Sequence, residues 1–450
     1  MVIMFNSYIE ARDWINSSIS FGIKPGLERM KVFMERLGNP HRRLKFIHVA
    51  GTNGKGSTCA FLNQVLQEAG YDVGMFTSPY IQRFTDRIQM NGEDISEEDV
   101  LFLTNEIKPI VDEIAKTELG SPTMFEITTT LAILYFSKIS YPDYVILETG
   151  LGGLYDSTNI VNPIASVITN IGHDHMDILG DTISQISVQK AGIIKPGIPV
   201  ISAVEQKEAI DVIRQTAAEN RSTLYLLNEQ FQYDIISMCE EKQSFHFQSP
   251  FRSIDSITIT NIGEHQFKNA SVALMVIEVL RQYQALIVEE DDLRLGFRKM
   301  KWPGRLEFVG SNPRILIDGA HNEEGAEYLA KTLKDLYTGT KVHFMLGMLD
   351  SKNHRGYLEH ILPVVNTLVI TEPDFRNKCD AQKLFDITKE LTKNKNIDLE
   401  IIIESDWKKA LKYLIEETNK DDLAVVTGTL YLISDVRSKL LQYPDSEKGW

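Results

Sequence analysis

Short apolar runs alternate with helical patterns over residues 44–203. The runs at 46–50, 144–148, 165–170 and 198–203 predict strands, and the spacing of apolar residues predicts helices over 125–136 and 183–193. Strands that alternate with helices are typical of a parallel sheet covered on both faces. We therefore expect a mostly parallel sheet in this part of the chain.

The pattern changes twice further along. Over 223–260, four short runs separated by polar turns, at 224–227, 232–238, 244–248 and 257–260, predict a small antiparallel sheet. After residue 297 comes the turn signal Trp302-Pro303-Gly304, and alternation then resumes with strands expected at 315–318, 342–347, 367–371, 399–403 and 423–427. The chain is thus predicted to be α/β, with one domain over 1–297 and a Rossmann-like α/β domain over 298–450.

A glycine-rich segment, Gly51-Thr52-Asn53-Gly54-Lys55-Gly56-Ser57, lies between the first predicted strand and a helical pattern at 58–69. Closely spaced glycines let backbone N–H groups converge on phosphate oxygens, and the following helix directs its positive end at the same anion. Standard P-loop spacing would place the first glycine at Val49, so this is a compact variant with an extra glycine after the lysine. It predicts a P-loop ATPase domain. A glycine-rich turn with a solvated lysine is the alternative, which the flanking strand and helix disfavour.

Three polar groups follow predicted strands or helices and are candidates for chemistry. Glu148 ends the strand at 144–148 and precedes a glycine-rich loop at 149–153, so it could hold the Mg²⁺ that a nucleotide enzyme needs, or simply cap the strand. His173 and His175 follow the next strand at the same expected sheet edge, where ligands bind in α/β folds, although a polar turn explains them equally well. Lys190 ends a predicted helix and, by charge alone, is an ordinary solvated lysine.

Composition narrows the class of protein. A net charge of −15 argues against general binding of nucleic acid or of anionic membranes. No apolar run approaches the ~20 residues of a membrane span, and charged residues at 10–13 interrupt any signal peptide, so we expect a cytoplasmic protein. Cys59, Cys239 and Cys379 form no Cys-x-x-Cys pair and are predicted to be buried thiols. We expect a monomer, since no extended heptad pattern is present.

From about Gly22 to the C-terminus, an ordered series of motifs resembles folylpolyglutamate synthase, a family that includes bifunctional dihydrofolate synthases and belongs to the Mur ligase superfamily. The motifs are Gly51 to Ser57, Thr77-Ser78-Pro79-Tyr80, Phe84 to Ile88, Glu148 to Asn159, Asp174-His175, Lys190-Ala191-Gly192, His265-Gln266, Asn269-Ala270, Pro303-Gly304-Arg305 and Asp318 to Asn322.

The resemblance implies a role for each candidate residue. Thr52, Asn53, Gly54, Lys55, Gly56 and Ser57 would hold the triphosphate of ATP, and Asn269, Arg305, Asp318 and His321 would contact the nucleotide. Ser78, Glu148, His175 and Lys190 match metal-site residues, Lys190 as a carbamate. The residues implied in catalysis are Lys55, Glu148, His175, Lys190 and His321.

The implied reaction is ATP-dependent addition of L-glutamate to the glutamate tail of a reduced folate through an acyl phosphate. A bifunctional enzyme that also joins dihydropteroate to L-glutamate shares every phosphate residue, so the motifs do not separate the two. The sequence departs from the family pattern at Leu154, Tyr80, Thr85-Asp86 and Glu323, which bears on the folate pocket and a mobile loop.

Three other classes of protein fit the sequence less well. A Mur ligase proper carries roughly 100 residues before its phosphate loop, whereas this loop begins at residue 51. A GTP-dependent switch is suggested by Asn419-Lys420-Asp421-Asp422, but this motif precedes an apolar run instead of following one, which favours a charged turn. A binding-only descendant is disfavoured because every phosphate and metal position carries a competent side chain.

Overall fold

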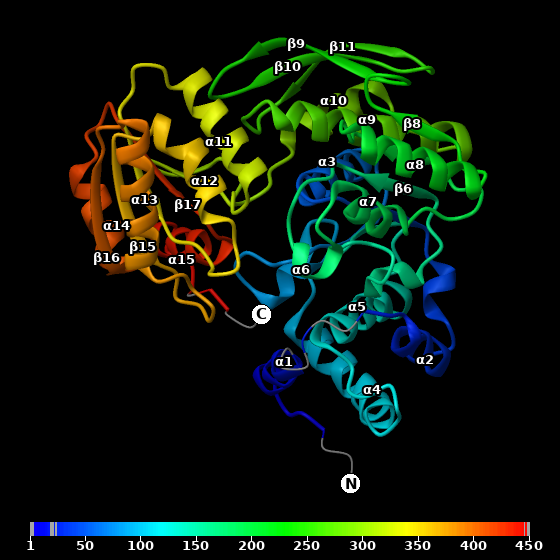
Figure 1. Cartoon of the computed structure of the whole chain (residues 1–450). Coiled ribbons are helices and arrows are strands. Elements are labelled where there is room, and N and C mark those ends of the chain that lie inside the picture. Colours follow the sequence, from blue (N-terminus) through cyan, green and yellow to red (C-terminus); the bar gives the residue numbers. More distant parts are fainter. Residues whose placement is uncertain (1–3, 19–21, 23–24, 445, 448–450) are drawn as a thin grey trace.

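The structure is a computed structural model that describes residues 4–18, 22, 25–444 and 446–447. Its first domain is built on an eight-stranded sheet of order β4-β3-β2-β5-β1-β6-β7-β8 (Figure 1). The strands are β1 (Phe46–Ala50), β2 (Val73–Phe76), β3 (Ile88–Met90), β4 (Glu93–Asp94), β5 (Tyr144–Glu148), β6 (Ala165–Ile168), β7 (Val200–Ser202) and β8 (Leu224–Leu226). Only the β2–β3 and β3–β4 pairs are antiparallel, so the mostly parallel sheet is confirmed.

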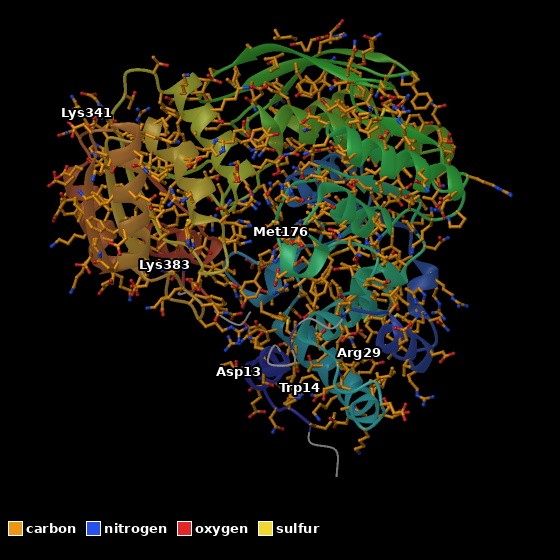
Figure 2. All side chains as sticks on the ribbon, viewed as in Figure 1. Asp13, Trp14, Arg29, Met176, Lys341 and Lys383 are labelled. Atoms are coloured by element: carbon orange, nitrogen blue, oxygen red, sulfur yellow. The ribbon has the colours of Figure 1, made fainter. Side chains whose placement is uncertain are left out.

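Helices cover both faces of this sheet. Its side chains pack on one face against α3 (Lys55–Glu68), α9 (His265–Tyr283) and α10 (Glu290–Lys299). The other face carries α1 (Tyr8–Ser17), α2 (Glu28–Arg36), α4 (Glu97–Ala115), α5 (Met124–Tyr135), α7 (Ile183–Ala191) and α8 (Lys207–Glu219). Among them, Arg29 of α2 lies inside the helical part of the domain and pairs with Glu126 of α5 (Figure 2).

A three-stranded antiparallel sheet spans the top of the molecule in Figure 1, formed by β9 (Gln232–Met238), β10 (Gln243–Gln248) and β11 (Ser253–Ile259). It rests on α9, where the rings of Phe245 and Phe267 meet with centroids 5.6 Å apart. The predicted small antiparallel sheet is therefore confirmed, but the inclusion of 224–227 in it was wrong. That run forms β8, because α8 precedes it as a crossover and brings it parallel to β7.

The second domain holds a six-stranded sheet of order β12-β13-β17-β14-β15-β16. Its strands are β12 (Glu307–Ser311), β13 (Arg314–Ile317), β14 (Val342–Leu346), β15 (Thr367–Glu372), β16 (Glu400–Asp406) and β17 (Leu423–Thr427). Only the β12–β13 pair is antiparallel. One face packs on α11 (Glu323–Leu336), α12 (His354–Ile361) and α13 (Ala381–Lys395), the other on α14 (Trp407–Glu417) and α15 (Leu430–Leu440). This confirms the Rossmann-like prediction.

Two expectations from composition can be compared with the structure. Cys59 and Cys379 are buried, but Cys239 is exposed, because it lies in the turn between β9 and β10. The expectation of three buried thiols was therefore wrong at Cys239. No helix among the described residues combines the length and apolar character needed to cross a membrane.

Candidate active site

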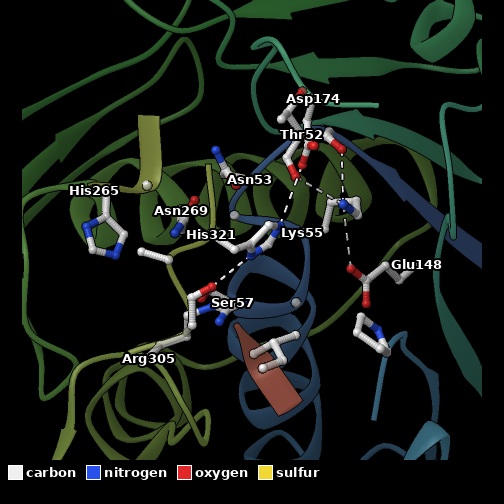
Figure 3. Close-up of a pocket in the computed structure, with 18 of the residues that line it drawn as sticks. Thr52, Asn53, Lys55, Ser57, Glu148, Asp174, His265, Asn269, Arg305 and His321 are labelled. Atoms are coloured by element: carbon white, nitrogen blue, oxygen red, sulfur yellow. Dashed lines mark hydrogen bonds and ion pairs between the residues drawn. The ribbon is translucent and has the colours of Figure 1, made fainter. Parts of the chain in front are cut away.

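All of the predicted site residues line one pocket, which lies where the second domain meets the carboxyl ends of β1 and β5 (Figure 3). They are Thr52, Asn53, Gly54, Lys55, Gly56, Ser57, Ser78, Glu148, His175, Lys190, Asn269, Arg305, Asp318 and His321. His173, the other histidine of its loop, is exposed and is not among the lining residues.

The phosphate loop leaves β1 at Ala50 and enters α3 at Lys55, three residues before the expected helix start. Gly54 has φ +81°, and a Cβ there would lie 2.3 Å from Asn269 Oδ1, so this position requires glycine. The N–H groups of Thr52 and Asn53 are taken by Asn170. The start of α3 offers further backbone N–H groups to an anion, because the first N–H groups of a helix have no partner within it.

Lys55 bends back over its own loop. Its amine donates to the carbonyl oxygens of Gly51 (3.1 Å) and Thr52 (3.2 Å) and lies 4.0 Å from Glu148 Oε1 (Figure 3). The lysine charge therefore stands at the mouth of the loop, held by weak contacts that a phosphate would replace.

Glu148 is the last residue of β5 and is buried. Ser78, which comes after β2 on the neighbouring strand, donates its backbone N–H to Glu148 Oε2 at 3.0 Å. Burial raises the pKa of this carboxyl group, and Lys55 and the Ser78 N–H partly oppose the shift. A carboxylate in such surroundings gains from a bound cation.

Lys190 lies in the last turn of α7 and its side chain is buried, so the interpretation as a solvated lysine was wrong. The structure gives its amine no hydrogen-bond or ion-pair partner among the described residues. Burial, with the charge of Lys55 as the next contribution, lowers the pKa of Lys190 to about 7. Near neutral pH a large share of these amines is uncharged and nucleophilic.

Asp174 connects the two domains, although the motif Asp174-His175 implies no role for the acid itself. Its carboxylate lies 2.7 Å from Lys352 Nζ, 3.5 Å from His321 Nε2 and 3.3 Å from Asn322 Nδ2, all on the second domain. Burial would raise its pKa, but the contact with His321 and the charge of Lys352 lower it below the usual range. Sequence could not reveal these contacts, because they form only when the domains meet.

The second domain's own loop is ordered by Asp318. This buried carboxylate accepts the N–H groups of Leu306 (3.0 Å) and Ala320 (2.9 Å), and Arg305 stands beside it as a counter-charge. His321 Nδ1 lies 2.8 Å from the Gly319 carbonyl oxygen, which leaves Nε2 toward Asp174. Arg305 of the linker thus presents a cation to the pocket, and His321 of this loop presents an imidazole.

The four predicted metal-site residues, Ser78, Glu148, His175 and Lys190, line the pocket together. Among the described residues, no group of three or more His, Cys, Asp and Glu side chains is arranged to hold a metal. Mg²⁺ prefers six ligands, mostly oxygens, and commonly takes some of them from a bound phosphate. Glu148, Ser78 and His175 therefore fit Mg²⁺ when oxygens from a nucleotide and from a carbamate on Lys190 are added to them.

The guanine-type motif at 419–422 lies outside the pocket. It forms a turn between α14 and β17, in which Asn419 Nδ2 donates to Asp422 Oδ2 at 2.9 Å. The charged-turn interpretation agrees with this arrangement.

Comparison with known proteins agrees with this geometry. The Mur ligase middle domain matches residues 49–277, and the Mur ligase glutamate ligase domain matches 304–430. These matches define an amide-bond-forming ligase that depends on ATP. The dihydrofolate synthase/folylpolyglutamate synthase of Bacillus subtilis is 41% identical over 97% of this chain and 100% of its own length.

Solved structures agree as well. E. coli FolC in complex with DHPP and ADP has a TM-score of 0.86 at 28% identity, covering 97% of this chain and 98% of its own. Mycobacterium tuberculosis folylpolyglutamate synthase complexed with ADP and AMPPCP has a TM-score of 0.86 at 26% identity, covering 98% of this chain and 100% of its own. The chain therefore belongs to the Mur ligase family, among the folylpolyglutamate and dihydrofolate synthases.

Proposed function

We propose that this protein joins L-glutamate to the glutamate tail of reduced folates at the expense of ATP, through an acyl phosphate. The observation that carries the proposal is the single pocket in which the phosphate loop, Glu148 and Lys190 of the first domain face Arg305 and His321 of the second. Relatives with this architecture carry folylpolyglutamate synthase names and have been solved with ADP and AMPPCP.

Each group has a place in such a reaction. Lys55 and the first N–H groups of α3 would hold the β- and γ-phosphates and stabilise the charge that develops on transfer. Asn269, Arg305, Asp318 and His321 would position the nucleotide from the other side of the pocket. Contact between the domains would exclude water, which protects an acyl phosphate from hydrolysis.

The metal-site residues would hold Mg²⁺ against the phosphates, where it supplies positive charge for phosphoryl transfer. Ser78, Glu148 and His175 would provide protein ligands, and a carbamate on Lys190 a further oxygen donor. The low pKa of Lys190 supports this modification, because only the neutral amine adds CO₂. The buried amine would then become an anion with a cation beside it.

A second candidate function is the bifunctional one, in which dihydropteroate is also joined to L-glutamate. It is favoured by the name of the Bacillus subtilis relative, dihydrofolate synthase/folylpolyglutamate synthase, which this chain matches over nearly its full length. The phosphate and metal residues would serve both reactions equally.

One experiment tests both functions. Purified protein is incubated with Mg-ATP and L-glutamate, with tetrahydrofolate in one reaction and dihydropteroate in another, and ADP release is measured. Release with tetrahydrofolate alone indicates a dedicated polyglutamate synthase, and release with both a bifunctional enzyme. Release with neither would contradict the substrate assignment.

Domain limits, location and oligomeric state remain predictions. We propose an ATP-binding domain over 1–297 and a ligase domain over 298–450, supported by family matches that end at 277 and resume at 304. A cytoplasmic monomer is the form we expect. Size-exclusion chromatography with light scattering tests the oligomeric state.

A further inference from the structure

Glu324, in the first turn of α11, reaches out of the second domain into the first. Its carboxylate accepts hydrogen bonds from Asn170 Nδ2, 2.7 Å from each oxygen, and from Asn53 Nδ2, 2.7 Å from Oε2. Asn53 belongs to the phosphate loop, and Asn170 follows β6. One side chain of the second domain thus holds two amides of the first.

Asn170 passes this contact on to the backbone of the phosphate loop. Its carbonyl oxygen Oδ1 accepts the Asn53 N–H at 2.7 Å, and its main-chain oxygen accepts the Thr52 N–H at 3.1 Å. The carboxylate of Glu324 attracts the NH₂ end of the Asn170 amide, and therefore turns Oδ1 toward the loop. Without that carboxylate, nothing else in the described contacts of Asn170 Nδ2 fixes this orientation.

The absence of a side chain at Gly172 leaves space for the Glu324 carboxylate. A Cβ on Gly172 would lie 2.8 Å from Glu324 Oε2, so a larger residue there would displace the acid. Gly172 in turn exchanges hydrogen bonds with the Thr52 hydroxyl, at 3.0 and 3.1 Å. The phosphate loop, the segment after β6 and Glu324 therefore form one connected unit.

The neighbouring acid, Glu323, provides a contrast on the same helix turn. It is exposed, and its polar contacts are with Asn353 (3.2 Å) and His360 (3.8 Å), both in its own domain. Charge and helix position are matched between the two residues. Of the two acids, only Glu324 contacts the phosphate loop, where it joins Asn322, whose side-chain amide exchanges hydrogen bonds with that of Asn53 at 3.1 and 3.3 Å.

We propose that Glu324 is a positioning residue that fixes the phosphate loop, through Asn53 and Asn170, when the second domain covers the pocket. Asn53 then serves this interdomain contact, since both its N–H and its side-chain amide are occupied, and phosphate falls to Lys55 and the start of α3. The proposal rests on the proposed function for its catalytic consequence: a loosened contact admits water, so that acyl phosphate is hydrolysed before glutamate attacks.

The test compares Glu324→Gln with Glu323→Gln. Glutamine keeps the size of the side chain but places an NH₂ against the asparagine NH₂ groups, which removes charge-assisted hydrogen bonds. We expect Glu324→Gln to weaken AMPPCP binding, measured by calorimetry, by about tenfold, the effect of losing roughly 1.4 kcal/mol. We also expect it to raise the ADP released per glutamate incorporated. Glu323→Gln should match the unchanged protein in both measurements.

A second variant makes the result specific. In the double variant Glu324→Gln with Asn170→Asp, the carboxylate lies in the first domain and the amide in the second, so the charge-assisted hydrogen bond between the two positions can form again. This variant should recover most of the lost AMPPCP affinity. Glu324→Asp, one methylene shorter, should show a smaller loss in the same direction and serves if Glu324→Gln unfolds, which thermal melting detects.

The proposal is overturned if Glu324→Gln and Glu324→Asp bind AMPPCP as tightly as Glu323→Gln does. It is also overturned if the double variant binds no better than Glu324→Gln alone. The binding measurement needs no folate, so it stands if the substrate assignment fails. Absence of glutamyl product from the unchanged protein would contradict the proposed function instead.

Discussion

The indole of Trp302 lies directly against Gly56. A Cβ on Gly56 would come within 2.8 Å of Trp302 Nε1 and 2.9 Å of its Cζ2. Gly56 is the extra glycine that distinguishes this loop from a standard P-loop, and Trp302 belongs to the segment that leads into the second domain. The unusual spacing of the loop therefore has a packing reason: it lets the linker sit on the first turn of the phosphate-binding helix.

Gly56→Ala should raise the KM for ATP by about tenfold, because the added methyl group pushes either α3 or the indole out of place. Steady-state kinetics with varied ATP measures this. Adding Trp302→Val, which removes the obstructing ring, should recover part of the loss. An unchanged KM for Gly56→Ala would show that the contact has no bearing on nucleotide binding.

Lys55→Ala and Glu148→Ala should each lower kcat by at least about 10²-fold with the fold intact. The first removes a positive charge that faces the transferring phosphoryl group, and the second removes a carboxylate that would hold Mg²⁺ against it. Circular dichroism controls for folding. Substantial remaining ligase activity in either variant would remove the roles assigned here.

Activity should depend on CO₂ through Lys190. With its pKa lowered to about 7, the amine is increasingly protonated below pH 7 and cannot add CO₂, and it is mostly neutral by pH 8. Protein stripped of CO₂ should therefore regain activity on addition of bicarbonate, faster at pH 8 than at pH 6.

The carbamate can also be observed without turnover. Labelling with ¹³C-bicarbonate should give a carbamate resonance that Lys190→Met lacks. The control is Lys383→Met, a change on the outside of the second domain that should keep the resonance (Figure 2). Activity insensitive to CO₂ at every pH would contradict the modification.

Arg29→Met should lower the free energy of unfolding by about 3–5 kcal/mol, because it leaves Glu126 as a buried carboxylate without its charge partner. Arg29 Nε lies 2.8 and 2.9 Å from the two oxygens of Glu126. Urea denaturation measures the change. Lys31→Met breaks only an exposed pair with Glu28 and should leave the free energy of unfolding nearly unchanged. An equal loss of unfolding free energy in the two variants would show that burial does not strengthen the Arg29–Glu126 pair.

Local patterns predicted the fold and much of the site because they follow from chain-local physics. The phosphate loop can be recognised from its glycines and from the strand and helix that flank it. Glu148 can be recognised as a candidate from its place at the end of a strand. The partners of the short run at β8 are not local, so its apolar pattern alone could not say which sheet it joins. The expectation for Lys190 from charge failed for a similar reason, since burial is set by packing.

The contacts of Asp174 and Glu324 were still harder to predict from the sequence. Both acids stand in loops or helix starts where a solvated carboxylate is ordinary, and each gains its partners from the opposite domain. One signal was present: Glu324 follows Asp318-Gly319-Ala320-His321-Asn322, a segment already assigned to the nucleotide. An acid beside such a segment is a reasonable candidate for contact across the pocket.

In the proposed function, this protein couples ATP cleavage to amide formation on a folate. To test this, the protein is incubated with Mg-ATP, L-glutamate and tetrahydrofolate. ADP and glutamyl-extended folate are both quantified, the latter by mass spectrometry. We expect extended folate in a one-to-one ratio with ADP and neither product without L-glutamate. Extended folate formed without ATP, or ADP released with no extended folate, would contradict it.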